Sequence, residues 1–135
     1  MSTLDNPKAL FQSTCSTNSE PYALQNIGDM MSPEFSENCI IIIDPGMPIH
    51  NEAYVIIDFN DELYFRQYII ENNQQLMRCL NPSYEDINLT DDFEVRGCIT
   101  QQKQRKKKSL HYYLIEKESG EMKFSAKGRG KEIAT

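Results

Sequence analysis

The chain has 135 residues, a formal net charge of −6 and an ordinary hydrophobic content of 39%. This length suits one compact domain with short tails. No apolar run approaches the roughly 20 residues that span a bilayer, and the polar N-terminus lacks the pattern of a signal peptide. We therefore expect a soluble, cytoplasmic protein with no membrane partner.

The charge is unevenly distributed along the chain. Up to Thr100 there are 4 basic against 16 acidic residues, a net of −12. Beyond Thr100 there are 10 basic against 4 acidic residues, a net of +6. This asymmetry predicts an acidic body with a basic C-terminal extension.

The four cysteines do not have the spacing of a metal site. Cys15, Cys39, Cys79 and Cys98 form no C-x-x-C pair, and the chain has only two histidines. Because zinc needs clustered ligands, we expect no metal site, and nothing in the sequence calls for another cofactor. The last three cysteines lie in strand-like runs, where they are expected to be small buried hydrophobes.

The first 100 residues read as an arm followed by a series of short strands. Residues 1–20 are polar and lack periodicity, which predicts a flexible arm. Residues 21–102 alternate apolar runs with turn residues, as in a mostly-β domain. We expect strands at 22–27, 39–43, 53–59, 63–70, 75–80 and 93–100, with a turn or short helical piece at 30–37.

The basic extension, residues 103–135, opens with six residues that include five cations. Two arrangements fit the residues after this run. Strands at 112–117 and 121–125 would form a hairpin around Ser119-Gly120, whereas a helix would begin at Ser109 and end at Gly120. The β-branched and aromatic content favours the hairpin. Residues 127–131 are expected to be disordered.

Several short motifs occur in one order along the domain. They are Gly28-Asp29-Met30-Met31-Ser32-Pro33, Ile40-Ile41-Ile42-Ile43-Asp44-Pro45, Arg66-Gln67-Tyr68, Asn81-Pro82-Ser83-Tyr84 and Gly97-Cys98-Ile99. Their order resembles the C-terminal domain of LexA and phage repressors, the S24 peptidases, which include the UmuD proteins. The resemblance implies a mostly-β, twisted-sheet fold with short helical pieces. It also implies a regulatory setting, either the SOS response to DNA damage or repression of a phage or mobile element.

The same resemblance places the family's catalytic serine at Met30 and its catalytic lysine at Arg66. A buried lysine with a lowered pKa can take the proton of a serine hydroxyl. A thioether has no such proton, and arginine stays protonated. Ser32, two residues away, would still lack a base. The family's self-cleavage bond, Ala-Gly or Cys-Gly, is also absent, because the arm has Cys15-Ser16 and no glycine before Gly28.

These absences predict a catalytically degenerate family member, an inactive peptidase homologue. Met30 is expected to plug the former active-site cleft. Arg66 is expected to form an ion pair with Asp29, Asp58 or Glu62. His50 is expected to be a surface loop residue.

Two binding functions are consistent with these features, with residual self-cleaving peptidase activity as a less favoured third. In the first, the domain is a pseudo-enzyme that associates as a homodimer or with a repressor, polymerase or other regulatory protein. The resemblance implies a dimer interface at the closing strand, with Phe93, Val95, Cys98 and Ile99 as candidates. In the second, the basic extension binds nucleic acid. Its candidate residues are Lys103, Arg105, Lys106, Lys107 and Lys108.

Overall fold

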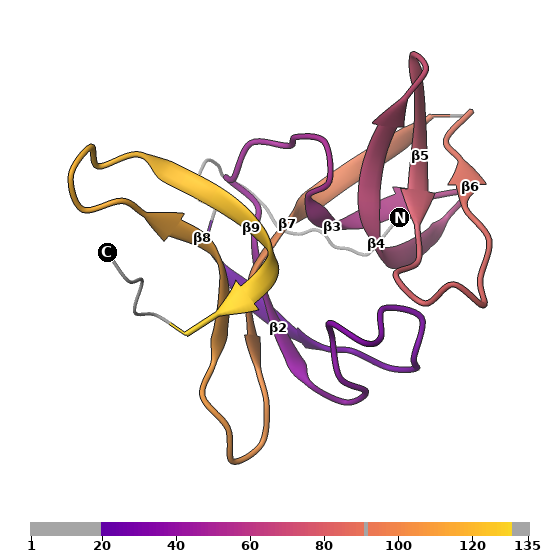
Figure 1. Ribbon diagram of the computed structural model, residues 1–135. Helices are drawn as coiled ribbons and strands as arrows, with labels where there is room; N and C mark the ends of the chain where they lie inside the picture. Colours follow the sequence, from indigo (N-terminus) through magenta and orange to yellow (C-terminus); the bar gives the residue numbers. More distant parts are fainter. Residues whose placement is uncertain (1–19, 91, 131–135) are drawn as a thin grey trace.

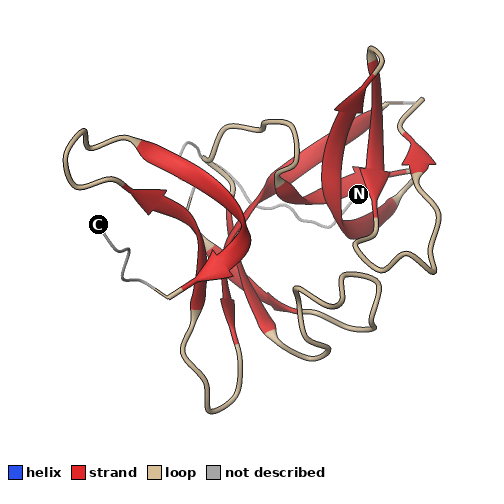
Figure 2. Ribbon diagram, viewed as in Figure 1, coloured by secondary structure: helices blue, strands red, loops and turns tan. Residues whose placement is uncertain are grey.

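The computed structural model describes residues 20–90 and 92–130, so the predicted arm lies outside the described residues apart from Glu20 (Figure 1). The described residues form strands, turns and loops and contain no helix (Figure 2). Residues 30–37 make turns instead of a short helical piece, and the Ser32–Pro33 peptide bond is cis. The mostly-β prediction is confirmed.

Nine strands occur in the described part of the chain. They are β1 (Tyr22–Gln25), β2 (Ile40–Asp44), β3 (Tyr54–Phe59), β4 (Glu62–Glu71), β5 (Gln74–Arg78), β6 (Ile87–Asn88), β7 (Phe93–Lys103), β8 (Leu110–Ile115) and β9 (Met122–Arg129). The predicted strands are present with shifted ends. β6 was not predicted, because it has only 2 residues and no apolar run.

The strands form one curled antiparallel sheet with β7 near its centre. The order is β1-β2-β7-β3-β4-β5-β6, with β8 paired to β7 and β9 paired to β8. β7 has 11 residues and pairs with β3 along its first half and β2 along its second half. Its first residues therefore lie beside the acidic β3–β4 turn, and its last residue, Lys103, begins the basic run.

Two hydrophobic clusters make up the core because the central strands bury both faces. On β3, Tyr54 and Ile56 point into one cluster, whereas Val55 and Ile57 point into the other. Alternate residues of a strand point to opposite faces. This double burial explains why residues 53–59 are an almost continuous apolar run, as in strands covered on both sides. Each fully buried side chain of this size contributes roughly 1.5–3 kcal/mol.

The C-terminal hairpin belongs to this core. The Tyr112 side chain is 0% exposed, and its ring centroid lies 5.0 Å from that of Phe35 and 5.4 Å from that of Tyr54. A Cβ atom at Gly128 would lie 2.7 Å from the Cβ of Leu110, so glycine is what lets β9 approach β8 there. The predicted boundary at residue 102 thus falls inside β7, and the hairpin continues the same sheet.

The order of β9 extends further than the sequence predicts. Residues 127–129 are part of the strand and are not disordered, and Lys131 lies outside the described residues. Two bonds hold this segment to the body. The Tyr54 hydroxyl donates to the Ala126 carbonyl oxygen at 2.7 Å, and the Gly128 N–H donates to a Glu34 carboxylate oxygen at 2.8 Å.

The cysteines of the described residues are buried, as predicted. Cys39, Cys79 and Cys98 are free thiols with exposures of 5%, 8% and 0%, and Cys15 lies outside the described part. Burial raises the pKa of Cys98 to about 11, and burial also raises the pKa of Cys39 and of Cys79. These thiols are protonated at neutral pH, which suits hydrophobic packing and not nucleophilic chemistry.

Candidate functional site

The first motif, residues 28–31, forms a tight turn after β1. Gly28 has a φ of +92°, a conformation that residues with a Cβ rarely adopt. The Ser32 N–H donates to the Asp29 carbonyl oxygen at 3.1 Å, which closes the turn. Met31 is 1% exposed in the core and fixes the turn in place, so the preceding residue, Met30, stays half-buried at the surface.

A second motif, Asn81-Pro82-Ser83-Tyr84, holds this turn from the other side. The Asn81 N–H donates to the Met30 carbonyl oxygen at 3.0 Å, and the Asn81 side-chain amide donates to the Asp29 carbonyl oxygen at 3.1 Å. The Tyr84 hydroxyl donates to the Asp29 carboxylate at 2.8 Å. That hydrogen bond raises the pKa of Tyr84. Sequence reasoning used Asn81 and Tyr84 only as markers of the fold and missed this positioning role.

β4 brings Arg66 to the same turn across 36 positions of sequence. Its Nη2 atom lies 3.5 Å from the Met30 Sδ, and its Nη1 donates to the Phe65 carbonyl oxygen at 2.8 Å. The Nε atom is buried without a hydrogen-bond partner in the described residues. The guanidinium carbon lies 5.1 Å from the Tyr64 ring centroid, within the range of a cation–π contact. The two positions to which the resemblance assigns the family's dyad are therefore in contact.

The predicted ion pair of Arg66 is wrong for the described residues, because each expected acid has another partner. Asp58 pairs with Arg96, Asp29 accepts the Tyr84 hydroxyl, and Glu62 accepts the Tyr64 hydroxyl at 2.8 Å. The positive charge of Arg66 acts instead on a buried thiol. Burial raises the pKa of Cys79, and the nearby guanidinium lowers it in part.

Met30 and Arg66 line an open cleft of about 310 Å³. Its walls come from β1 and the turn that follows it, from β2 and β3, and from the start of β4. They include Leu24, Ile27 and Leu63, with exposures of 41%, 67% and 63%. Met30 thus forms part of the wall of this cleft, and space remains beside it.

A polar cluster joins the turn segment to the C-terminal hairpin. A Glu34 carboxylate oxygen accepts from the Tyr112 hydroxyl at 2.7 Å as well as from Gly128. The Gln102 side-chain amide donates to the Tyr112 hydroxyl at 2.8 Å and to the Glu34 carbonyl oxygen at 2.9 Å. Burial, and next the Glu34 carboxylate, raise the pKa of Tyr112.

Comparison with known proteins identifies the fold family. A sequence profile described as Peptidase S24-like matches residues 2–100. The chain belongs to the S24 peptidase-like family. The profile ends before β8, so the hairpin that supplies Tyr112 lies beyond the matched range.

Its similar relatives are described as HTH-type transcriptional regulators for conjugative elements. They are those for element R391 of Providencia rettgeri, element SXT of Vibrio cholerae and element pMERPH of Shewanella putrefaciens. Each is 28% identical over 87 residues, which cover 59% of this chain and 40% of the relative. The S24-like chain thus matches well under half the length of these regulators.

The five candidate nucleic-acid-binding cations of this S24-like chain lie in and next to the β7–β8 connection. Lys103 ends β7, and residues 105–108 follow it, all exposed. Among the described residues, none of the five forms an ion pair with a carboxylate. The base of the connection is fixed, because the Gln104 side-chain amide donates to the Ser36 hydroxyl at 2.9 Å and to the Gln102 side-chain oxygen at 3.0 Å.

The four candidate dimer residues of β7 differ in accessibility. Phe93 and Val95 are half-buried, whereas Cys98 and Ile99 are 0% exposed inside the two core clusters. A partner could contact the first two side chains without opening the core. Phe93 also lines a wide hollow of about 920 Å³ with acidic residues. That hollow is lined by Asp58, Asn60, Asp61, Thr90, Asp92, Phe93 and Glu94.

Three further features of the described residues bear on the candidate site. His50, expected at the surface, is half-buried, and its Nε2 lies 2.7 Å from the Tyr113 hydroxyl. Within residues 20–90 and 92–130, no group of three or more His, Cys, Asp or Glu side chains has the arrangement of a metal site. In the same residues, no helix is long and apolar enough to cross a membrane.

Proposed function

We propose that this chain is a non-catalytic S24-like module that acts in transcriptional regulation through association with other proteins. The observation that carries the proposal is the contact between Met30 Sδ and Arg66 Nη2. These residues occupy the positions of the nucleophile and the base, and neither can perform that role. A thioether offers no proton for transfer, and a guanidinium does not act as a base at accessible pH.

The regulatory setting is supported by the names of the relatives, which are regulators for conjugative elements. The resemblance to LexA, UmuD and phage repressors points to the same class of process, with repression of a mobile element or the SOS response as its two forms. In such a setting the domain contributes a surface. Its partners are a second copy of the chain, a repressor or a polymerase.

The loss of chemistry is tested with a peptide supplied in trans that contains an Ala-Gly bond flanked by apolar residues. After prolonged incubation, mass spectrometry should find the peptide intact with the unmodified chain. The double variant Met30→Ser/Arg66→Lys should cleave it slowly. Each single variant serves as a control and should be inactive, because a serine without a base, or a base without a nucleophile, lacks half of the mechanism. Cleavage by the unmodified chain would refute the proposal.

Association through β7 is tested by multi-angle light scattering. Val95→Glu places a charge on the half-buried face of β7 and should convert dimers into monomers. Ile115→Glu is the control, because Ile115 is 58% exposed on β8, away from that face. A monomeric unmodified chain, or equal behaviour of both variants, would exclude a β7 interface.

A second candidate function, nucleic-acid binding, is favoured by the cationic β7–β8 connection. Its cations are exposed, have no carboxylate partner in the described part of the chain, and sit on a base fixed by Gln104. Such a cluster attracts phosphates and releases their counterions on binding. The connection is therefore positioned to contact a phosphate backbone.

This second function is tested by charge removal, not by deleting the extension, because Tyr112 is part of the core. Replacing Arg105, Lys106, Lys107 and Lys108 with glutamine should abolish binding of duplex DNA in a fluorescence anisotropy titration at low salt. Replacing Lys117 and Lys123 with glutamine, at the other end of the hairpin, should have a much smaller effect. Absence of any DNA binding by the unmodified chain at low salt would remove this candidate.

A further inference from the structure

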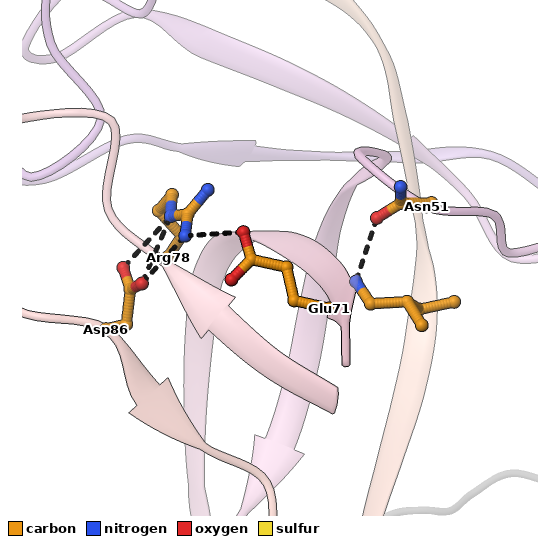
Figure 3. Close-up of polar contacts among 5 residues, drawn as sticks. Asn51, Glu71, Arg78 and Asp86 are labelled. Carbon is orange, nitrogen blue, oxygen red and sulfur yellow. Dashed lines mark hydrogen bonds and ion pairs between the residues drawn. The ribbon is translucent and has the colours of Figure 1, made fainter. Parts of the chain in front are cut away.

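Arg66 differs from the other arginines between residues 20 and 100. Arg78 forms ion pairs with two carboxylates, the nearer being Asp86 at 2.9 Å (Figure 3). Arg96 pairs with Asp58. Arg66 has no carboxylate partner among the described residues, and its Nε atom is buried without a hydrogen-bond partner there. A partly buried cation without a counter-charge is unfavourable unless another group neutralises it.

The hydrogen-bonding capacity of this guanidinium is incompletely used. A guanidinium carries five N–H groups. Nη1 donates one to the Phe65 carbonyl oxygen, and Nη2 directs one to the Met30 thioether at 3.5 Å, which is a weak acceptor. The Nε–H and one N–H group on each terminal nitrogen have no acceptor among the described residues. A guanidinium can bind a carboxylate through both of its oxygens with two such N–H groups.

The surroundings of these N–H groups are apolar and open. Arg66 lines the cleft of about 310 Å³ together with Leu24, Ile27 and Leu63, whose side chains are 41–67% exposed. This volume lies at the small end of the range for ligand pockets. A mainly apolar cleft with one cation on its wall, and Gln25 and Asn26 as further polar residues, matches a largely apolar ligand with a single negative charge. A phosphate group, with about two charges, would demand more cations than this cleft offers.

We propose that this cleft binds the end of an apolar peptide, with Arg66 holding the free C-terminal carboxylate through its terminal nitrogens. The inference rests on the proposed function, since it assigns a binding role to the residues that replace the dyad. The apolar side chains of the peptide cover Leu24, Ile27 and Leu63, and the guanidinium gains the counter-charge that the described residues do not supply. The site is thereby a receptor for a peptide end and makes or breaks no covalent bond.

The test uses a fluorescein-labelled tetrapeptide, Ala-Leu-Val-Ala, with the label on its N-terminus. Fluorescence anisotropy with the full chain should show binding of the peptide with a free carboxylate. Its C-terminal amide should bind about 10- to 100-fold more weakly, because a hydrogen bond to a charged group is lost. A third peptide, amidated and with glutamate as the last residue, separates a terminal from a side-chain carboxylate. It should bind as weakly as the second peptide, and binding at the level of the first peptide would overturn the assignment to a peptide end.

Three variants locate the site. Arg66→Gln should weaken binding of the free carboxylate about 10- to 100-fold and leave binding of the amide unchanged. Leu63→Glu, at an exposed position, should abolish binding by placing an acid beside Arg66, and it remains informative if the Arg66 variant unfolds. Arg105→Gln removes the same charge from the β7–β8 connection and should have no effect.

Equal affinity for the carboxylate and the amide would overturn the inference, as would an Arg105→Gln effect as large as that of Arg66→Gln. Mass spectrometry of the same samples distinguishes failure of this inference from failure of the proposed function. A cleaved peptide refutes the non-catalytic proposal, whereas an intact peptide that binds without regard to its charge refutes only the carboxylate site.

Discussion

Glu34 and Arg66 are both half-buried charged side chains packed around the turn that follows β1, yet their surroundings differ. The Glu34 carboxylate accepts from Tyr112 and Gly128, two residues of the C-terminal hairpin. Arg66 has a thioether, its neighbour's carbonyl oxygen and a buried Nε without a partner in the described part of the chain. Glu34 joins two parts of the fold through its hydrogen bonds. Arg66 keeps N–H groups without an acceptor among the described residues, and these are available to a ligand.

Tyr112→Ala should have the largest effect on stability. It removes a fully buried aromatic side chain that contacts two other rings and donates to Glu34, so the free energy of unfolding should fall by about 3–5 kcal/mol. Urea unfolding followed by circular dichroism measures it. Ile115→Ala, at an exposed position of the same strand, is the control. A loss below about 1 kcal/mol would show that the hairpin is not part of the core.

Glu34→Gln should have the next largest effect. The amide oxygen can still accept both hydrogen bonds, but without the negative charge the bonds to Tyr112 and Gly128 weaken, so we expect a loss of about 1–3 kcal/mol. The same urea titration reports it, with exposed Glu37→Gln as the matched control. If both variants unfolded at the same urea concentration, the hairpin would be held by packing alone.

The pH dependence sharpens the comparison further. Burial and the Glu34 carboxylate raise the pKa of Tyr112 above its ordinary value near 10. The folded state therefore keeps this proton while the unfolded state loses it, and stability that is present below pH 10 is lost as the pH rises above it. Tyr112→Phe removes this titration. Between pH 10 and 11 the unmodified chain should lose about 1 kcal/mol more than the variant. Equal slopes would show that Tyr112 ionises freely in the folded state.

Arg66→Met should have the smallest effect on stability. It removes an incompletely paired cation and places an apolar side chain against Met30, so the free energy of unfolding should change by less than about 1 kcal/mol in either direction. Thermal unfolding monitored by calorimetry measures it, with Arg78→Met for comparison. A loss above about 2 kcal/mol would place Arg66 with Glu34 as a structural residue.

The strands and the meeting of Met30 with Arg66 were predictable for different reasons. The strand at residues 53–59 was predictable because both of its faces are buried, so few of its positions are polar. The meeting of Met30 and Arg66 follows from motif order, because the family's fold brings these two segments together. Neither prediction depends on the conformation of an individual side chain.

The partners of individual side chains were not predictable. Asp58 was a candidate partner for Arg66. The pairing of β3 with β7 instead brings Arg96 next to Asp58, and these two form an ion pair. The burial of Tyr112 was not predicted, because the exposed cations that precede it indicated an extension outside the core. The cleft beside Met30 depends on how far a methionine side chain fills a space bounded by four strands, which no single segment determines.

β7 joins an acidic end of the molecule to a basic one. Its first residues line the hollow with Asp58, Asp61 and Asp92, and its last residue begins the cationic connection, about 35 Å away for 11 extended residues. The described part of the molecule therefore carries opposite charge at the two ends of this strand. In the field of a polyanion it turns before contact, basic end first, so its association rate should fall steeply with ionic strength while its acidic end faces away, free for a second contact.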